Sequence, residues 1–513
     1  MATRSPPINS ASSAHVDALL VRQAMPCSIT MPAGTGKTEI IAAMTRLTAD
    51  VQQRALVLTH THAGVDALRR RIKRMGVPQG AARVETIASW SHQLVRHYPN
   101  LAGVTVPVEP VWADSALYYK GAARVIQARS LQHVLAATYT FAIVDEYQDC
   151  TTRQHGLAAA ISTAIPVAVF GDPLQAIFGW DDADPLPSWS GEVQSLWPDL
   201  RISTHPWRWK DYNADLGQWL LGVRDNFSQR TPIRIGDGTP VRWVPSAEQY
   251  RAMVRECRDA RVRYPAESIV AIGMWDRDCN GVGSHLNGSY SVMETIEGKD
   301  MVDFARIVDQ GDAPAVAAAT ATWGKTCISG ISPLIKSEDV RRLEAGKPIA
   351  HLLRPGAKAA QELLSSLLTT PGAAAVRAAL VAIGQLPGGA TYRHDAWRTV
   401  LNALRTAEAS DQSVAEAVIQ HRNRTRATGR QSGRHTVSRP TLIKGLEYDH
   451  AIVLDADQHE PSSLYVALTR ARTTLTVISK QPELRTQSRQ TARGVGRSQE
   501  PRADAAVQQL SLI

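Results

Sequence analysis

Cysteine and long apolar runs are scarce in this sequence, and their scarcity excludes several classes of protein. The five cysteines are scattered, their number is odd, and no two of them have the CxxC spacing. A disulfide framework and a zinc site are therefore not expected, and the thiols fit a reducing compartment. The 15 histidines include no HExxH pair, which is the pattern typical of a metalloprotease.

No apolar run approaches the roughly 20 residues that a membrane-spanning helix needs. Residues 1–13 are polar and lack the apolar centre of a signal peptide. We therefore expect a cytoplasmic protein that does not interact with a membrane.

The composition is that of a globular protein with more than one domain. The chain has 513 residues, of which 44% are hydrophobic and 20% are charged, and domains comprise about 100–200 residues each. The formal net charge is +9 and the pI is about 9.4. A positive excess favours polyanionic partners such as nucleic acids, although many basic proteins bind none.

Short apolar runs separated by turns predict buried parallel strands. These runs are residues 27–31, 55–59, 141–144, 167–170, 269–274, 451–454 and 474–478. Helical patterns lie between many of them, and a stretch rich in Ala and Leu with helical character occupies about 300–438. We predict two α/β domains with parallel sheets and a mostly helical insertion.

Residues 32–38, with the sequence PAGTGKT, have the pattern of a phosphate-binding loop. They follow a predicted strand and precede a helical pattern, which is the context that this motif requires. The predicted nucleotide-binding residues of this loop are Ala33, Gly34, Thr35, Gly36, Lys37 and Thr38. Backbone N–H groups and the Lys37 charge would face the phosphates, and the Thr38 hydroxyl can coordinate Mg²⁺. The alternative is an ordinary glycine-rich turn.

A pair of carboxylates ends the apolar run at 141–144. In a chain with a phosphate loop, Asp145 is expected to hold Mg²⁺ and Glu146 to orient the attacking water and accept its proton. Without such a loop, two acids after an apolar run would more often mark a solvated strand end.

Eight strings in the chain resemble, in the same order, segments of the UvrD/Rep/PcrA group of superfamily 1 helicases. DEYQD at 145–149 resembles motif II. The others are LTHTHAG at 58–64 (motif Ia), TIASW at 86–90 (the TxHSF segment), GDPLQAIFGW at 171–180 (motif III), PWR at 206–208 (motif IV), EGKD at 297–300 (the ExKD segment), KGLEYD at 444–449 (motif V) and YVALTRA at 465–471 (motif VI). The resemblance spans about residues 27–480.

The resemblance implies further nucleotide-site residues. Gln175 would sense the γ-phosphate, while Arg208 and Arg470 would stabilise charge on the transferring phosphoryl oxygens. Both arginines are expected in the second α/β domain, so that ATP would bind between the domains. Gly445 and Glu447 would lie near the nucleotide, with Glu447 near the ribose.

The resemblance also implies contacts with DNA. Trp180 would stack on a base of a single strand, with a role in the core as the alternative, and His62 would touch the backbone. The chain departs from the family pattern at several positions: Asp181 replaces the usual arginine, and Gln23 is the nearest candidate for the glutamine that reads adenine. Six arginines between residues 422 and 439 are interpreted as phosphate contacts or as a solvated loop.

The resemblance implies two RecA-like parallel-sheet domains with mostly helical insertions. The expected organisation is a disordered N-terminus at 1–13, a first RecA-like domain at 14–205 with an insertion at 91–135, a second RecA-like domain at 206–300 and 436–480, a mostly helical insertion at 301–435, and a disordered tail at 481–513.

The function implied is that of an ATP- and Mg²⁺-dependent translocase or helicase on single-stranded DNA or tailed duplex, moving 3′→5′. The alternative is a nucleotide-gated DNA-sensing subunit that regulates a separate partner, such as a nuclease in phage defence. A repair protein is another candidate partner, and an RNA motor is the third hypothesis.

Overall fold

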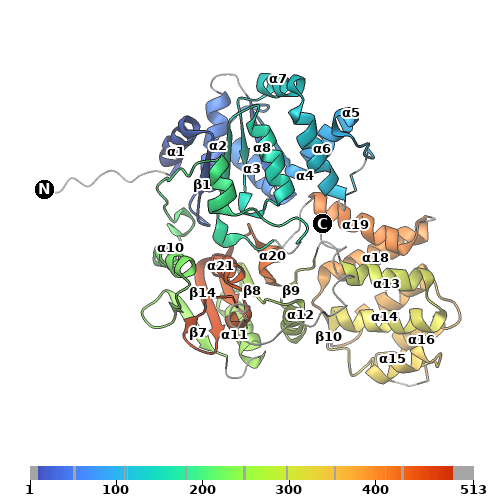
Figure 1. Ribbon diagram of the computed structural model, residues 1–513. Helices are drawn as coiled ribbons and strands as arrows, with labels where there is room; N and C mark the ends of the chain where they lie inside the picture. Colours follow the sequence, from blue (N-terminus) through green and yellow to red (C-terminus); the bar gives the residue numbers. More distant parts are fainter. Residues whose placement is uncertain are drawn as a thin grey trace, which may run out of the picture. The chain divides into compact units, whose positions relative to one another are not determined.

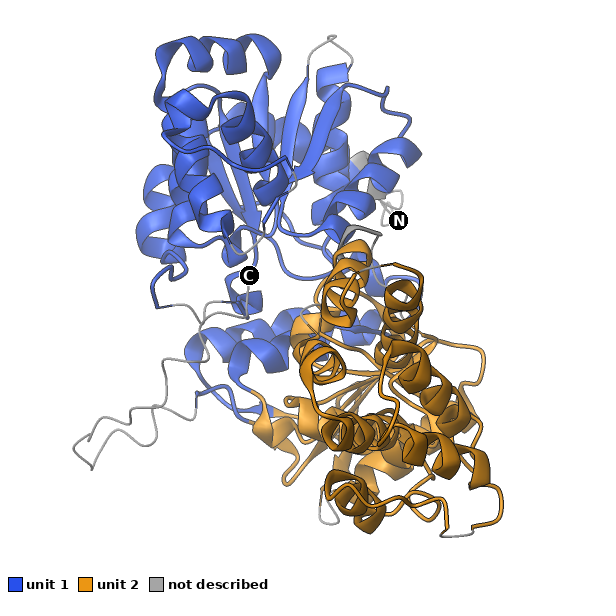
Figure 2. Cartoon of the chain, turned by 90° about the vertical axis from the view of Figure 1, so that its right-hand side faces the viewer, with its two compact units in different colours: residues 1–233, 460–473, 485–513 blue, residues 234–459, 474–484 orange. Residues whose placement is uncertain are grey.

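A computed structural model describes residues 10–49, 54–108, 110–111, 114–178, 182–246, 250–295, 298–351, 354–410, 412–428 and 433–488 (Figure 1). The chain forms two compact units (Figure 2). Unit 1 comprises residues 1–233, 460–473 and 485–513, and unit 2 comprises residues 234–459 and 474–484.

Unit 1 is built on a five-stranded parallel sheet with the order β1-β5-β4-β2-β3. Its strands are β1 (Cys27–Thr30), β2 (Ala55–Thr59), β3 (Ala82–Thr86), β4 (Phe141–Val144) and β5 (Val167–Gly171). Four of them were predicted. The edge strand β3 was not, because Arg83 and Glu85 interrupt its apolar pattern.

Helices cover both faces of this sheet, because successive strand side chains point to opposite faces. Ala55 and Val57 share a core with α1–α3, whereas Leu56 and Leu58 share a core with the helices from α4 to α8. The helices are α1 (Ser10–Ala24), α2 (Lys37–Ala49), α3 (His62–Arg74), α4 (Ile87–His97), α5 (Pro99–Ala102), α6 (Ser115–Gln127), α7 (Arg129–Thr138) and α8 (Thr152–Ser162). The stretch at 91–135, predicted as an insertion, thus contributes helices that cover the sheet.

Three predicted boundaries differ from the structure. Helix α1 begins at Ser10, within the segment expected to be disordered, because Ala14, Ala18 and Val21 form a stripe that is buried in the core. Residues 206–233, including α10 (Ala214–Gln229), belong to unit 1 rather than to the second domain. The expected tail includes β15 (Glu483–Leu484), and Leu484 is buried.

Unit 2 contains a six-stranded sheet with the order β7-β14-β13-β8-β12-β9. Its strands are β7 (Val241–Pro245), β8 (Ile269–Ile272), β9 (Ser291–Val292), β12 (His435–Ser438), β13 (Tyr448–Val453) and β14 (Ala471–Ser479). On one face, α11 (Tyr250–Arg263) and α12 (Asp276–His285) pack against Ile269, Ala271 and Ile452. Two large parallel sheets with many helices confirm the α/β fold class and are consistent with two RecA-like domains.

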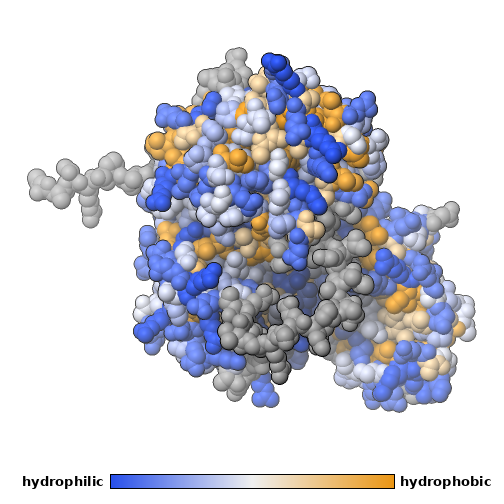
Figure 3. All heavy atoms as spheres, viewed as in Figure 1, coloured by the Kyte–Doolittle hydropathy of each residue, from blue (hydrophilic) through white to orange (hydrophobic). Residues whose placement is uncertain are grey.

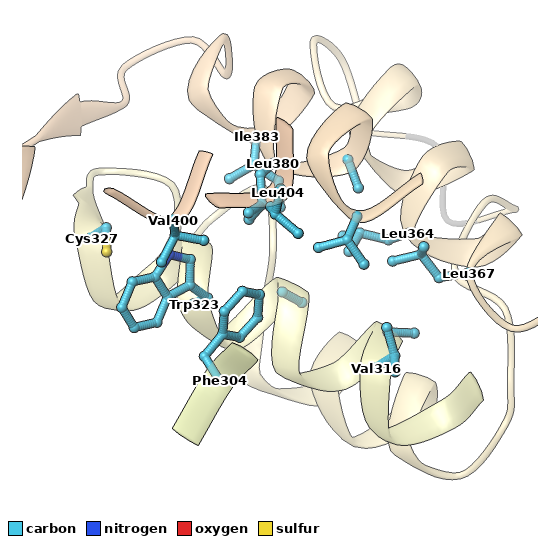
Figure 4. Close-up of a cluster of buried hydrophobic side chains, with 14 of the residues drawn as sticks. Phe304, Val316, Trp323, Cys327, Leu364, Leu367, Leu380, Ile383, Val400 and Leu404 are labelled. Carbon is cyan, nitrogen blue, oxygen red and sulfur yellow. The ribbon is translucent and has the colours of Figure 1, made fainter. Parts of the chain in front are cut away.

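Residues 299–428 of unit 2 form a mostly helical region with its own core. The core includes Phe304, Val316, Leu364, Leu380 and Leu404 (Figure 4). The helices are α13 (Lys299–Gln310), α14 (Ala313–Cys327), α15 (Ser337–Glu344), α16 (Lys358–Ser366), α17 (Ala373–Gly384), α18 (His394–Ala409) and α19 (Val414–Thr428), and β10 (Ile328–Ser329) pairs with β11 (Ala390–Thr391).

A buried ion network joins this helical region to the sheet of unit 2. Arg393 is 3% exposed and donates to both carboxylate oxygens of Glu294, at 2.8 and 2.6 Å. It also donates to Asp300 of α13 at 2.6 Å and lies over the ring of Trp323. Because Glu294 follows β9 and Arg393 precedes α18, the network fixes two helices to the end of a strand.

The arginines between residues 422 and 439 divide into different environments. Arg422 is 3% exposed and pairs with Asp395, so it is not available to a nucleic acid. Arg439 pairs with Asp276 at 2.9 Å, and Arg434 is exposed. Arg430 lies outside the described residues, and the side chain of Arg426 is not among those described. Neither interpretation of these arginines, as phosphate contacts or as a solvated loop, therefore holds for Arg422.

The surface drawn in Figure 3 is mostly hydrophilic, with apolar residues scattered in small groups. All five cysteines are buried. Within the described ranges, no helix has both the length and the apolar character needed to cross a membrane.

Candidate functional site

The loop between β1 and α2 has the backbone of an anion-binding turn. Gly34 and Gly36 adopt left-handed conformations, with φ of 72° and 99°, which side chains with a Cβ rarely tolerate. The Thr35 hydroxyl donates to the Pro32 carbonyl at 2.8 Å. Helix α2 starts at Lys37, and the first N–H groups of a helix lack partners within it and attract anions. Residues 33–38 therefore have the geometry that phosphate binding requires.

A second segment, residues 206–209, packs directly on this loop. The backbone N–H of Arg208 donates to the Gly34 carbonyl at 3.1 Å. A Cβ on Gly34 would lie 2.6 Å from an atom of the Trp209 ring, and one on Gly36 would lie 3.1 Å from Trp207. The loop is thus supported by Trp209, which is 1% exposed.

The two carboxylates after β4 lie against the loop lysine. Lys37 Nζ is 3.1 Å from Asp145 Oδ1 and also donates to Glu146. Burial by itself would lower the pKa of Lys37, but the charges of Asp145 and Glu146 outweigh it, so that this pKa is raised. The lysine therefore remains a cation. Only β5 lies between β1 and β4 in the sheet, which brings their carboxyl ends close together.

Glu146 has an unusual backbone conformation. Its φ of 55° and ψ of 38° are left-handed, which costs an L-residue roughly 1–2 kcal/mol. Its carboxylate accepts from Gln148 Nε2 at 2.6 Å, and Gln148 Oε1 accepts from the N–H of Asp172 at 2.9 Å. Gln148 thus links the residues after β4 to those after β5. Backbone strain of this kind is often found at functional sites.

Gln175 and Arg470 meet above the end of β5. Gln175 lies in the short helix η3 (Pro173–Gln175), and its Nε2 donates to Asp172 Oδ2 at 2.9 Å. Its Oε1 accepts from Arg470 Nη2 at 3.3 Å. Arg470 is 1% exposed and also donates to the Val466 carbonyl and the Thr469 hydroxyl.

Arg208 is held to the same chain segment as Arg470. Its Nη1 donates to the Thr469 carbonyl at 2.7 Å, while Trp209 Nε1 donates to the Ala471 carbonyl at 2.7 Å. Both arginines were expected in the second domain; they fall in unit 1, and Arg470 directly precedes β14, a strand of the six-stranded sheet. Their segments are bonded to each other, and the Trp209 segment packs on Gly34.

The other predicted site residues have different outcomes. His62 is the first residue of α3, three residues after Thr59, the last residue of β2. Gly445 and Glu447 lie in unit 2 between α20 (Pro440–Ile443) and β13, with Gly445 at φ 82°. Trp180 lies outside the described residues. The structure thus brings together the loop, Asp145, Glu146, Gln175, Arg208 and Arg470 within unit 1.

Sequence reasoning missed three residues that shape this site. Gln148 lies inside the DEYQD string, and its position there was a usable signal. Trp209 directly follows the PWR string at 206–208, and it supports the phosphate loop. Arg224, in the middle of α10, pairs with Asp172, and nothing in the surrounding sequence distinguishes it from a surface arginine.

Comparison with known families gives two matches. The family described as an AAA domain matches residues 17–180, a range that contains the phosphate loop, Asp145, Glu146 and Gln175. The family described as a viral superfamily 1 RNA helicase core domain matches residues 398–479, a range that contains Arg470. No curated protein matches the chain.

Proposed function

We propose, from two family matches that indicate a superfamily 1 helicase-like P-loop protein, that the chain is an ATP-dependent translocase or helicase of the UvrD/Rep/PcrA type. Such domains imply a nucleotide hydrolase. The observation that carries the proposal is the cluster around the loop: Lys37 beside Asp145 and Glu146, with Gln175 bonded to Arg470.

ATP with Mg²⁺ fits the residues of this cluster. The left-handed glycines and the start of α2 present backbone N–H groups to phosphates, and Lys37 stays positively charged. The Mg²⁺ ion would be held by Thr38, which lies in the first turn of α2, and by Asp145, which is 5% exposed. When bound, Mg²⁺ would neutralise charge on the phosphate oxygens.

Three further side chains would act on the reaction itself. Glu146 would orient the attacking water and accept its proton. Arg208 and Arg470 would stabilise charge that develops on the phosphoryl oxygens, and these contacts matter most in the transition state. Gln175 would report the state of the γ-phosphate, since its amide already bonds to Arg470. Gly445 and Glu447 are proposed as nucleotide contacts from motif V.

Single-stranded DNA is the proposed track, with movement 3′→5′. The support is the order of the motif strings and the net charge of +9. Trp180, five residues after Gln175, is proposed as a base-stacking residue, and His62, the first residue of α3, as a backbone contact. The viral family that matches residues 398–479 is described as an RNA helicase core, so RNA is the competing track.

The decisive experiment measures ATP hydrolysis by the full chain alone, with single-stranded DNA and with single-stranded RNA. We expect hydrolysis that DNA stimulates more than RNA does. Unwinding of duplexes with 3′ or 5′ tails then tests direction, and a 3′ tail should be required. The absence of any nucleotide hydrolysis would refute the enzyme proposal, and stimulation by RNA alone would refute DNA as the track.

A further inference from the structure

Asp172 is a fully buried carboxylate whose main ionic partner is Arg224. Its side chain is 0% exposed, and Arg224 holds both of its oxygens, at 2.8 and 2.9 Å. A carboxylate removed from water in this way is expensive unless it is paired with good geometry. Arg224 lies in α10, far in sequence from the segment that it binds.

Asp172 in turn fixes the orientation of Gln175. An amide can turn over and exchange its donor and acceptor ends, and its neighbours decide which end points where. Asp172 Oδ2 accepts from Gln175 Nε2, so Gln175 Oε1 is the end that meets Arg470. Arg224 donates to both oxygens of Asp172, and Oδ2 also accepts from Gln175 Nε2, which keeps the amide in this orientation.

Arg224 contacts the other half of the cluster as well. Its Nη1 also donates to the hydroxyl of Tyr465 at 2.5 Å. Tyr465 lies in α21 (Pro461–Leu468), and its carbonyl accepts from the hydroxyl of Thr469, the residue before Arg470. One guanidinium therefore bonds to the segment that carries Gln175 and to the helix that leads to Arg470.

We propose that Arg224 is a positioning residue that sets the Gln175–Arg470 contact by clamping Asp172 and Tyr465 together. The proposal rests on the proposed function, since it assigns these two residues to the hydrolysis site. Arginine suits the role because its planar fork can hold a carboxylate with two bonds and still reach a third acceptor. Lysine would keep the charge but not this geometry.

The test is a double-mutant cycle on ATP hydrolysis with Arg224→Met and Gln175→Ala. We expect Arg224→Met to lower kcat on the order of 10- to 100-fold, which is less than the roughly 10²–10³-fold cost of losing one oriented catalytic donor because Gln175 itself remains, and to change the affinity for ATP less than about threefold. If Arg224 acts through Gln175, the double variant should be no slower than Gln175→Ala alone. Arg224→Lys should recover part of the lost rate.

Controls separate positioning from a purely structural role. Arg201→Met changes an arginine that is 94% exposed in the same unit and should leave kcat unchanged. Melting curves of each variant show whether it is folded at the assay temperature. If Arg224→Met does not fold, Arg224→Lys and Tyr465→Phe take its place in the cycle, since each weakens the clamp without leaving Asp172 unpaired.

The outcomes are distinct. The proposal is supported if Arg224→Met lowers kcat in the wild-type background but causes no further loss in the Gln175→Ala background. Losses that multiply in the double variant, or a folded Arg224→Met variant with the wild-type kcat, would overturn it while leaving the proposed function standing. A wild-type chain that hydrolyses no nucleotide would overturn the proposed function, and the catalytic role of Arg224 with it.

Discussion

Each unit contains a buried arginine that pairs with a carboxylate, but the two pairs connect to different kinds of residue. In unit 1, Arg224 holds Asp172 with two bonds, and Asp172 bonds to Gln175, which meets Arg470. In unit 2, Arg393 holds Glu294 with two bonds, but its other neighbours are Asp300 and the Trp323 ring. The first network ends on Gln175 and Arg470, which are proposed to act in nucleotide hydrolysis, and the second ends on helices.

The difference teaches that buried charge does not by itself mark a site. Both arginines have raised pKa values because paired carboxylates outweigh the effect of burial, and both pairs would be costly to break. What distinguishes unit 1 is that charged groups surround a loop with left-handed glycines at the end of a strand. We therefore expect that breaking the buried pair lowers the rate of ATP turnover in unit 1 and the free energy of unfolding in unit 2.

The largest expected effect is that of Lys37→Ala, which should abolish ATP hydrolysis and leave the fold intact. The change removes the charge that faces the phosphates and little core volume. The matched control is Lys325→Ala, because residues 324–326 repeat the letters GKT but lie within α14, where Lys325 bonds to Ser337 on the surface. Hydrolysis assays should show full activity for the control, and near-normal activity of Lys37→Ala would contradict the loop assignment.

Glu146→Gln should slow turnover by roughly 10²–10⁴-fold, the usual contribution of a general base, while binding of ATP with Mg²⁺ persists. The amide keeps the shape of the side chain but cannot accept the proton. Single-turnover hydrolysis and equilibrium titration with a fluorescent ATP analogue separate the two steps. Loss of nucleotide binding instead would indicate that Glu146 acts in the ground state or in the fold.

Arg393→Met should destabilise unit 2 by about 3–5 kcal/mol, because it leaves a buried carboxylate without its partner. Activity per folded molecule should change little. Denaturant unfolding and the ATPase rate of the folded fraction are the two measurements. The companion double variant, Arg393→Met with Glu294→Leu, should recover much of the stability. An ATPase defect in the fully folded Arg393→Met protein would break the contrast between the units.

Trp180→Ala should have the smallest effect, a loss of about 1–3 kcal/mol in single-strand binding. ATP hydrolysis without DNA should survive, and the salt dependence of binding should barely change, since phosphate contacts remain. Trp180→Phe should retain much of the affinity because it keeps an aromatic face. A large drop in melting temperature, together with loss of DNA-independent hydrolysis, would instead place Trp180 in the core.

The sequence predicted strands where apolar runs were continuous and failed where polar side chains interrupt the run, whether or not those side chains are buried. β2 and β4 were located to the residue, whereas β3, with Arg83 and Glu85, and the short β12 were not. The phosphate loop and the acidic pair were found because each is a local string that follows a strand. Arg224 and Trp209 were not, because their roles come from partners far away in the chain.

The domain boundaries show the same limit. The position of Arg208 in the chain favoured the second domain, since motif IV follows the last strand of the first sheet. What decides its place is a set of bonds to residues 469–473, more than 250 residues later. Long-range bonds of this kind leave no periodic pattern in the sequence.

The close approach of Trp209 to Gly34 has a consequence for reading related sequences. A side chain at position 34 would meet two penalties, one from the left-handed φ of 72° and one from a ring 2.6 Å away. The second penalty persists whether or not nucleotide binds. A descendant that had lost hydrolysis would still need this glycine to keep its tryptophan in place. Lysine at position 37 is not required for this packing against Trp209, so it is the better indicator of whether a relative still uses ATP.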